Sequence, residues 1–347
     1  FFAPRAGGDR KNCHIILSRR RAMFFTEYKP EKFCREYVEA KISSRQLVMF
    51  MSVVLGIKPA MDDWITNDRL AALKKACKKY GLLLEPDIGF IDVDDQSLKD
   101  SGGGGTLTTT VARGIQVRNA GAKDMIHVFI SRKQESLEAI SGNGWYPVVV
   151  GDRVVHKPYI DLLKFGYNLG YPTCCVDFFR HYNDWYKYSH LWEVFKNTRS
   201  RPSYLCNCFT KDLTYGYIYH IPCSYDCLAT KKLAGGLRQA IGAEEPRFVE
   251  LIDRHLRLPF LIFYETVMYA FEGELKNGKL SYSQVYFLGR DSRGNNYYQN
   301  ILEKGDSLFV EGRTVFVSKG GKKVGKIEAQ TQPNGFAPEY PFLIQFE

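Results

Sequence analysis

Six of the nine cysteines lie in the segment from Gly170 to Cys227, which begins GYPTCC and ends HIPCSYDC. No other stretch of the chain limits its fold as strongly, because thiols at this local density are typical of a metal or redox centre. Such a centre needs a scaffold that brings distant thiols together. The rest of the 347-residue chain is therefore interpreted as that scaffold.

Prolines near the cysteines predict where helices begin. Pro172 stands two residues before the adjacent pair Cys174 and Cys175, and another proline directly precedes Cys223. Proline is favoured in the first turn of a helix, where unpaired N–H groups and the helix dipole stabilise a thiolate. Both cysteine pairs are therefore predicted at helix N-termini. Cys223 and Cys227 would share one face of their helix, because they are four residues apart.

Four such thiolates fit more than one kind of centre. Iron–sulfur clusters take thiolates from varied spacings and distant segments, which favours a [4Fe–4S] cluster on Cys174, Cys175, Cys223 and Cys227. Zinc is the alternative, because C-x3-C lies within the usual range of zinc knuckles, although adjacent cysteines are an unusual zinc hairpin. A metal-free dithiol site and unligated cysteines stay open. The spacing does not decide whether Cys206 and Cys208 complete the ligand set.

The two ends of the segment also carry a resemblance. GYPTCC with the later HIPCSYDC is similar to the signature of a poorly characterised group of prokaryotic cysteine-cluster proteins, with G-Y-P-x-C-C and H-x-P-C-S-x-x-C segments. The likeness is confined to the stretch from Gly170 to Cys227. It implies an iron–sulfur cluster and no particular reaction. The matching positions are Cys174, Cys175, Cys223 and Cys227, whereas Cys206 and Cys208 fall outside the pattern.

Two titratable residues are candidates for catalysis beside the thiols. Cys174, Asp177 and His181 are spaced i, i+3 and i+7, which is one face of the predicted helix. Asp177 and His181 could transfer protons there or hydrogen-bond to a ligand, or they could lie on a solvent-facing surface. His220 stands among three tyrosines and could replace a cysteine ligand or pack in the core.

The leading functional hypothesis is an iron–sulfur enzyme. A cluster held by three thiolates would leave one iron open for Lewis-acid or sulfur-transfer chemistry of the lyase or sulfur transferase type. Its substrate would be a small anion or carrier, because the net charge is +10, with an electron or sulfur donor protein as partner. The alternatives are a zinc-stabilised nucleic-acid-binding module and a metal-free dithiol redox protein. Nucleic acid is a possible partner but is not favoured.

The pattern of apolar residues predicts an α+β fold in three regions. Residues 1–100 are predicted to be mostly helical after a basic start, with helices at 30–40, 44–55 and 70–80. Residues 101–257 form a mixed α/β centre that carries the cysteines. Residues 258–347 form a β-rich unit of short strands joined by glycine turns. The glycine-rich stretch 101–110 is a hinge or an anion-binding loop.

Cysteine usage and hydropathy indicate the compartment. An odd number of cysteines without the spacing of a disulfide scaffold favours a reducing environment, so a cytoplasmic location is expected. No run of 18 apolar residues occurs, so neither a membrane span nor a membrane partner is predicted.

Overall fold

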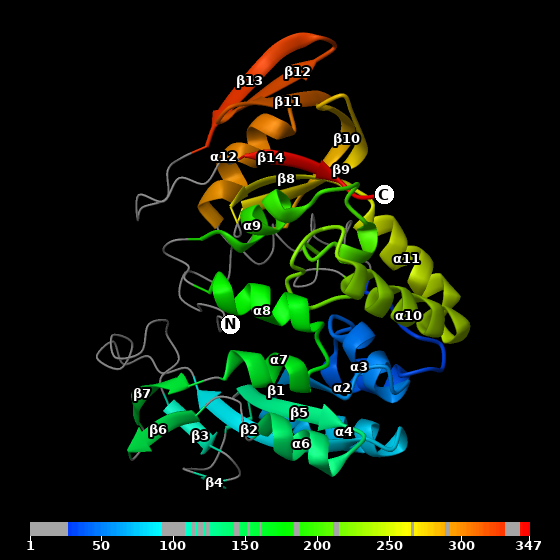
Figure 1. The fold of residues 1–347 in the computed structure, drawn as a ribbon, viewed down its shortest axis with the longest axis vertical. Coiled ribbons are helices and arrows are strands. Elements are labelled where there is room, and N and C mark those ends of the chain that lie inside the picture. The colour runs from blue at the N-terminus through cyan, green and yellow to red at the C-terminus, as the bar shows by residue number, and fades with distance from the viewer. Residues whose placement is uncertain are drawn as a thin grey trace. The chain divides into compact units, whose positions relative to one another are not determined.

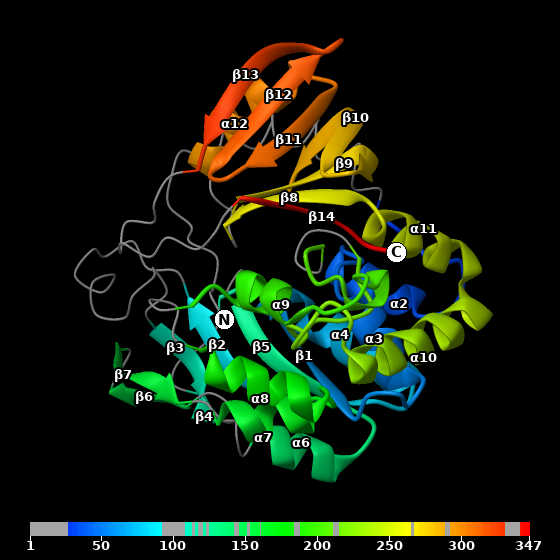
Figure 2. The same cartoon turned by 45° about the horizontal axis from the view of Figure 1, so that its top comes forward.

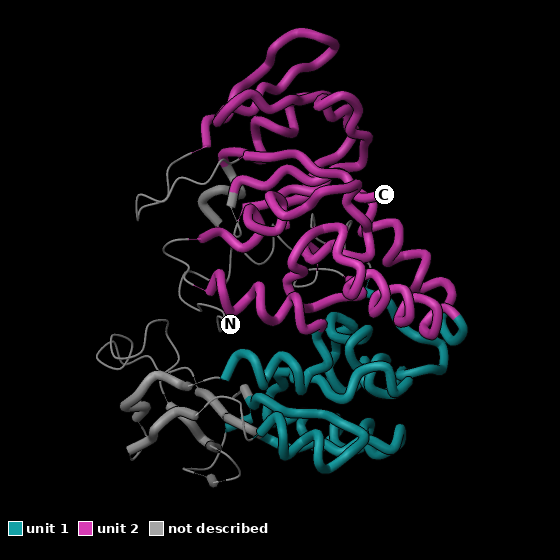
Figure 3. Tube along the Cα trace, viewed as in Figure 1, with its two compact units in different colours: residues 1–171, 243–245 teal, residues 172–242, 246–347 magenta. Residues whose placement is uncertain are grey.

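The computed structural model describes residues 27–91, 108–112, 115–116, 121–122, 125–141, 146–150, 153–159, 161–183, 188–210, 215–264, 267–288, 292–329 and 341–347. The basic N-terminal segment and most of the glycine-rich stretch lie outside these ranges. The chain divides into two compact units (Figure 3). Unit 1 is residues 1–171 with 243–245, and unit 2 is residues 172–242 with 246–347. The division into three regions at residues 100 and 257 stays a prediction.

Unit 1 contains an antiparallel sheet of five strands, in the order β1-β5-β2-β3-β4. The strands are β1 (Ala60–Thr66), β2 (Leu83–Ile91), β3 (Thr108–Ala112), β4 (Ile115–Gln116) and β5 (Met125–Ser131). A separate hairpin follows, made of β6 (Tyr146–Val150) and β7 (Arg153–Tyr159). Strands β1 and β2 were not predicted, so the N-terminal region is less purely helical than expected.

The helices of unit 1 pack on this sheet. They are α2 (Arg35–Lys41), α3 (Leu47–Val54), α4 (Asn67–Lys79), α6 (Gln134–Ser141) and α7 (Leu162–Asn168). Phe129 of β5 packs with Leu137 of α6 and Phe165 of α7 in one buried cluster. The three helices predicted before residue 80 correspond to α2, α3 and α4. Cys34 and Cys77 are buried in this unit, which is usual for free cysteines that pack as small apolar side chains.

The first half of unit 2 carries the cysteine segment. Its elements are α8 (Thr173–His181), α9 (His190–Asn197), the 3-10 helix η1 (Tyr204–Cys206), α10 (Leu228–Glu244) and α11 (Pro246–Leu256). Helix α8 begins directly after Pro172, as the proline pattern predicted. The prediction that Cys223 and Cys227 share one face of a helix is wrong. Residues 223–226 form a turn, and α10 begins only at Leu228.

The second half of unit 2 is an antiparallel sheet of seven strands, in the order β13-β12-β11-β10-β9-β8-β14. The strands are β8 (Pro259–Tyr264), β9 (Val267–Lys276), β10 (Lys279–Phe287), β11 (Ser307–Glu311), β12 (Thr314–Lys319), β13 (Lys322–Glu328) and β14 (Phe342–Gln345). Helix α12 (Ser292–Leu302) lies against one face of it (Figures 1 and 2). That face buries an apolar core that includes Phe271, Leu308 and Val317. With this sheet, the predicted α+β class and β-rich C-terminal part are confirmed.

An aromatic cluster joins the two halves of unit 2. Phe209 contacts the rings of Tyr225, Phe260 and Phe346 at centroid distances of 5.3–5.6 Å. Tyr225 follows Cys223 by two residues, and Phe260 lies on β8. The cysteine segment and the sheet therefore share one continuous core. Among the helices that the structure describes, none has the length and apolar character needed to cross a bilayer.

Candidate metal centre

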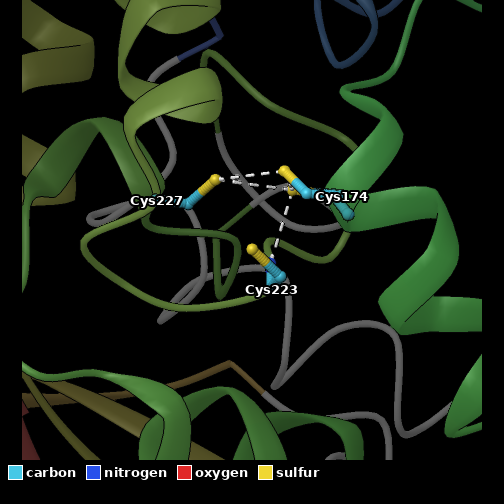
Figure 4. A group of neighbouring side chains, drawn as sticks. Cys174, Cys223 and Cys227 are labelled. Atoms are coloured by element: carbon cyan, nitrogen blue, oxygen red, sulfur yellow. Dashed lines mark hydrogen bonds between the residues drawn. The ribbon is translucent and has the colours of Figure 1, made fainter.

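Three separate backbone segments bring the four predicted ligands together. Cys174 and Cys175 lie in the first turn of α8, where the N–H of Cys175 bonds to the carbonyl of Pro172. Cys227 stands just before α10 and accepts the first bond of that helix, from the N–H of Lys231 at 2.9 Å. Cys223 projects from the preceding turn. Figure 4 shows the side chains converging from these segments.

The sulfur atoms lie at metal-binding separations. The Sγ of Cys227 is 3.7 Å from the Sγ of Cys174 and 3.7 Å from that of Cys175. The sulfurs of Cys174 and Cys175 are 3.9 Å apart. All four ligand atoms, including that of Cys223, lie within 4.8 Å of one another. This cysteine tetrad could hold a metal ion, as the sequence predicted.

Burial differs across the tetrad. Cys175 is 1% exposed and Cys227 is 7% exposed, whereas Cys223 is half-buried and Cys174 is exposed. The tetrad therefore presents one side to the surface through Cys174. Its inner side is closed by the protein, where Cys206 belongs to the same buried cluster as Cys175 and Cys227.

Hydrogen-bond donors point at the inner sulfurs. The backbone N–H of Cys223 donates to the Sγ of Cys175 at 3.4 Å. The Thr230 hydroxyl, fully buried in the first turn of α10, lies 3.2 Å from the same sulfur. His220 Nε2 lies 3.0 Å from that hydroxyl oxygen. If the hydroxyl donates its one proton to a thiolate, it accepts from His220, which places the imidazole proton on Nε2.

Mutual hydrogen bonding sets the acidities of the metal-free thiols. Hydrogen bonds from Cys175 and Cys223, with a smaller contribution from Thr230, lower the pKa of Cys227. The neighbouring Cys223 and Cys227 raise the pKa of Cys175, and burial adds to this effect. Cys227 thus forms a thiolate readily, whereas Cys175 and Cys223, whose pKa values are raised, keep their protons. A bound cation would displace those protons.

The other residues singled out in the sequence take different places. Asp177 and His181 are exposed on α8, and seven residues of helix place His181 about 10 Å along the axis from Cys174. Their predicted catalytic role stays a prediction. His220 is 7% exposed and bonds to Thr230. Asp226 accepts bonds from the backbone and hydroxyl of Ser200, which fixes the turn between Cys223 and Cys227.

Cys206 and Cys208 lie outside the tetrad. Cys206 is completely buried, and its Sγ lies 3.7 Å from the carbonyl oxygen of Cys227. Burial raises the pKa of Cys206, so its thiol stays protonated. Cys208 is also buried, 3% exposed. In the described structure, neither sulfur belongs to the group that could share one metal ion.

Sequence analysis missed Thr230. A signal was available in the spacing. Cys227 stands at the N-cap of a helix and Thr230 is the third residue of that helix, and side chains at these two positions commonly bond to each other or to backbone amides. The three-residue step from a ligand cysteine to a threonine therefore places a hydroxyl beside the centre.

No protein-family model, curated protein or solved structure matches this chain.

Proposed function

We propose that the chain is a zinc-stabilised binding protein, in which the cysteine tetrad holds one zinc ion. The separations between sulfurs carry this proposal. Zinc bonds to thiolate at about 2.3 Å in tetrahedral geometry, which places the four sulfurs about 3.8 Å apart. The three separations within the group Cys174, Cys175 and Cys227 are 3.7, 3.7 and 3.9 Å.

A [4Fe–4S] cluster fits these separations less well. Each of its thiolates binds a different iron at a corner of the cube, so the ligand sulfurs stand about 6 Å apart. All four sulfurs here lie within 4.8 Å. Cluster binding would require Cys227, at the start of α10, to move away from the α8 cysteines. The iron–sulfur hypothesis therefore has less support than zinc.

Four thiolates fill the coordination of zinc, which is the arrangement of structural rather than catalytic sites. The metal would link the start of α8, the turn at Cys223 and the start of α10 by covalent-like bonds. Lewis-acid or sulfur-transfer chemistry needs an open position that this arrangement lacks. Zinc here would contribute to the folding free energy of unit 2.

The hydrogen bonds around the tetrad support metal binding. Thiolates on zinc carry negative charge that buried surroundings must offset, and N–H or O–H donors to sulfur do so. The Cys223 N–H and the Thr230 hydroxyl supply two such bonds to Cys175, the most deeply buried ligand.

Metal analysis of the purified protein tests the proposal. The chain is expressed in medium containing both iron and zinc, purified without oxygen, and analysed for iron, zinc and acid-labile sulfide. We expect about one zinc per chain, no visible chromophore, and an X-ray absorption edge fitted by four sulfurs at about 2.3 Å. Zinc should be lost when each ligand cysteine is replaced by alanine.

Cys206→Ala is the matched control, because it removes a buried thiol next to the tetrad and should keep the metal. Iron and sulfide in similar amounts, with visible absorption that the ligand variants remove, would establish the iron–sulfur centre instead. A protein free of metal with a reversible disulfide would support the dithiol hypothesis.

A further inference from the structure

Lys58 is a lysine buried in unit 1, just before β1. Its side chain is 2% exposed, and among the described residues no acceptor lies within hydrogen-bond distance of its Nζ. Lysine is almost never fully buried unless it is paired, because an unpaired charge away from water is costly. An amino group in this position therefore needs a reason other than packing.

Two titratable side chains near this amine are paired with each other. Strands β1 and β5 set Asp62 opposite Phe129 and Trp64 opposite His127, which puts the four side chains on one face of the sheet. Phe129 packs under α6 and α7, so these helices cover that face (Figure 1). On it, His127 Nε2 lies 3.2 Å from a carboxylate oxygen of Asp62. The carboxylate whose charge acts on Lys58 is therefore bonded to an imidazole and not to the amine.

Aromatic rings border this polar group. The Nζ of Lys58 lies 4.2 Å from the centroid of the Tyr171 ring, which packs against the apolar cluster under α6 and α7. The rings of His127 and Trp64 are 4.8 Å apart between centroids. The Asp62 side chain is 20% exposed and Tyr171 is half-buried, so the group reaches the surface at these two residues. Lys58 lies at its inner, closed end.

Burial and hydrogen bonding set the charges of the group. Burial lowers the pKa of Lys58 to about 7, although the nearby Asp62 opposes the shift. Burial would raise the pKa of Asp62, but the hydrogen bond with His127 holds the pKa of this carboxyl below its usual value. At neutral pH, a large share of the Lys58 side chains are therefore neutral amines beside an ionised carboxylate. A desolvated neutral amine is a nucleophile for carbonyl groups.

We propose that Lys58 forms an imine with a small aldehyde or ketone, and that Asp62 and His127 move the protons of this reaction. The amine nitrogen attacks the carbonyl carbon, and the proton that it releases goes to the carbonyl oxygen, which gives a carbinolamine. The Asp62–His127 pair then protonates the hydroxyl, and the C–O bond breaks to release water. The product is a protonated imine on Lys58, whose positive charge is stabilised by the Asp62 carboxylate and the Tyr171 ring.

The charges favour an uncharged carbonyl compound over an anion. An anion at Lys58 would be repelled by the Asp62 carboxylate, and a neutral amine offers no charge to attract it. The site goes beyond the proposed zinc centre, because all of its residues lie in unit 1 and none is a cysteine of the tetrad. The two proposals can therefore fail separately. Cys174→Ala should lose zinc and keep imine formation at Lys58.

Reductive trapping on the full chain tests the proposal. The protein is treated at pH 7 with acetaldehyde and sodium cyanoborohydride, which reduces an imine to an N-ethyl amine, and each lysine is followed by peptide mass spectrometry. A lysine with the ordinary pKa of about 10.4 is neutral in only about one molecule in 2,500 at this pH, so Lys58 should be ethylated about tenfold faster than the exposed Lys78, or more. Lys58→Met should fold, because it removes a buried charge, and should lose this fast reaction alone.

Acetic anhydride separates proton transfer from simple nucleophilicity, because acetylation of an amine needs no acid to expel water. His127→Gln should slow ethylation of Lys58 about tenfold or more and leave its acetylation within about twofold, since general acid–base catalysis typically contributes a hundredfold or more. Asp62→Asn keeps the shape of the side chain and should also slow ethylation without slowing acetylation. Lys78 should react at its original rate in both variants, and circular dichroism confirms that both fold.

Two results would overturn the proposal. One is ethylation of Lys58 no faster than that of Lys78, which would show that a small carbonyl compound does not react at the buried amine. The other is fast ethylation that His127→Gln and Asp62→Asn leave unchanged. It would make Lys58 a buried amine of low pKa without a site built around it.

Discussion

The Thr230 hydroxyl lies 3.2 Å from the Cys175 sulfur, at the point where α10 begins beside α8. Thr230 is fully buried, and its oxygen is also 3.0 Å from His220 Nε2. Cys175, the most buried of the four cysteines, is thus hydrogen-bonded to Thr230, and Thr230 is in turn hydrogen-bonded to His220. Neither Thr230 nor His220 belongs to the cysteine tetrad, and both would influence the charge and orientation of the Cys175 thiol if the tetrad holds a metal.

Removing the hydroxyl should weaken metal binding. We expect Thr230→Val to lower zinc affinity about tenfold, because hydrogen bonds to ligands of a metal typically contribute tenfold to a hundredfold. Competition with a chromogenic chelator measures the change. Thr230→Ser keeps the hydroxyl and should bind within about twofold of the unaltered protein. Equal losses in the valine and serine variants would show that packing, not the hydrogen bond, is responsible.

Metal removal should loosen unit 2 locally. Chelation takes away the link between α8 and α10, so amide hydrogens in the first turns of both helices should exchange faster. Hydrogen exchange read by mass spectrometry compares the zinc-loaded and chelated protein. Strands β1 and β5 of unit 1 contain no ligand and should keep their protection. Unchanged exchange in α8 and α10 would contradict a structural role for the metal.

Gly170, which opens the GYP motif, should not tolerate a side chain. Its φ is +74°, and an added Cβ would lie 2.5 Å from Cδ of Pro59. We expect Gly170→Ala to destabilise unit 1 by about 2 kcal/mol or more, from backbone strain plus the clash. Gly81 is the matched control, with φ of +67° and no atom within 4 Å of an added Cβ. Gly81→Ala should cost about 1 kcal/mol in urea unfolding, and equal costs would rule out the clash.

Lys58 should make unit 1 more stable as the pH rises. Its side chain is 2% exposed, its Nζ has no hydrogen-bond partner among the described residues, and it lies 4.2 Å from the Tyr171 ring centroid. Burial lowers the pKa of Lys58 to about 7, although the nearby Asp62 opposes the shift. Between pH 7 and the unfolded pKa of about 10.4, Lys58 is protonated in the unfolded chain but neutral in the folded one. The free energy of unfolding should therefore increase across this window.

Lys58→Met should remove that rise and stabilise the protein at pH 6 by about 1–3 kcal/mol, because the buried charge is gone. Urea unfolding at pH 6, 8 and 10 measures both effects. Lys78→Met is the control, since Lys78 is exposed on α4 and should change neither the stability nor its pH dependence. Destabilisation of the Lys58 variant at pH 6 would show that its ammonium makes a net favourable contact with the Tyr171 ring and Asp62.

Local patterns in the sequence determined the elements whose signals are local. The prolines predicted the start of α8, the apolar periodicity predicted α2, α3 and α4, and the alternation with glycine turns predicted most strands of the C-terminal sheet. Strands β1, β2 and β14 were missed. Each pairs with a strand distant in the sequence, β1 and β2 with β5 and β14 with β8, and such pairing leaves little local pattern.

The sequence pointed to Cys174, Cys175, Cys223 and Cys227 as candidate ligands but left open whether Cys206 and Cys208 join them. The structure brings those four thiols together and leaves Cys206 and Cys208 outside the group. Only the tertiary structure decided how far apart the sulfurs stand, and that separation is what distinguishes a single tetrahedral ion from a cluster. It depends on where α8, the turn at Cys223 and α10 are held by the core of unit 2. Phe309 of β11 and Phe316 of β12 are a similar case, because the register of the two strands, not either strand alone, stacks their rings on each other.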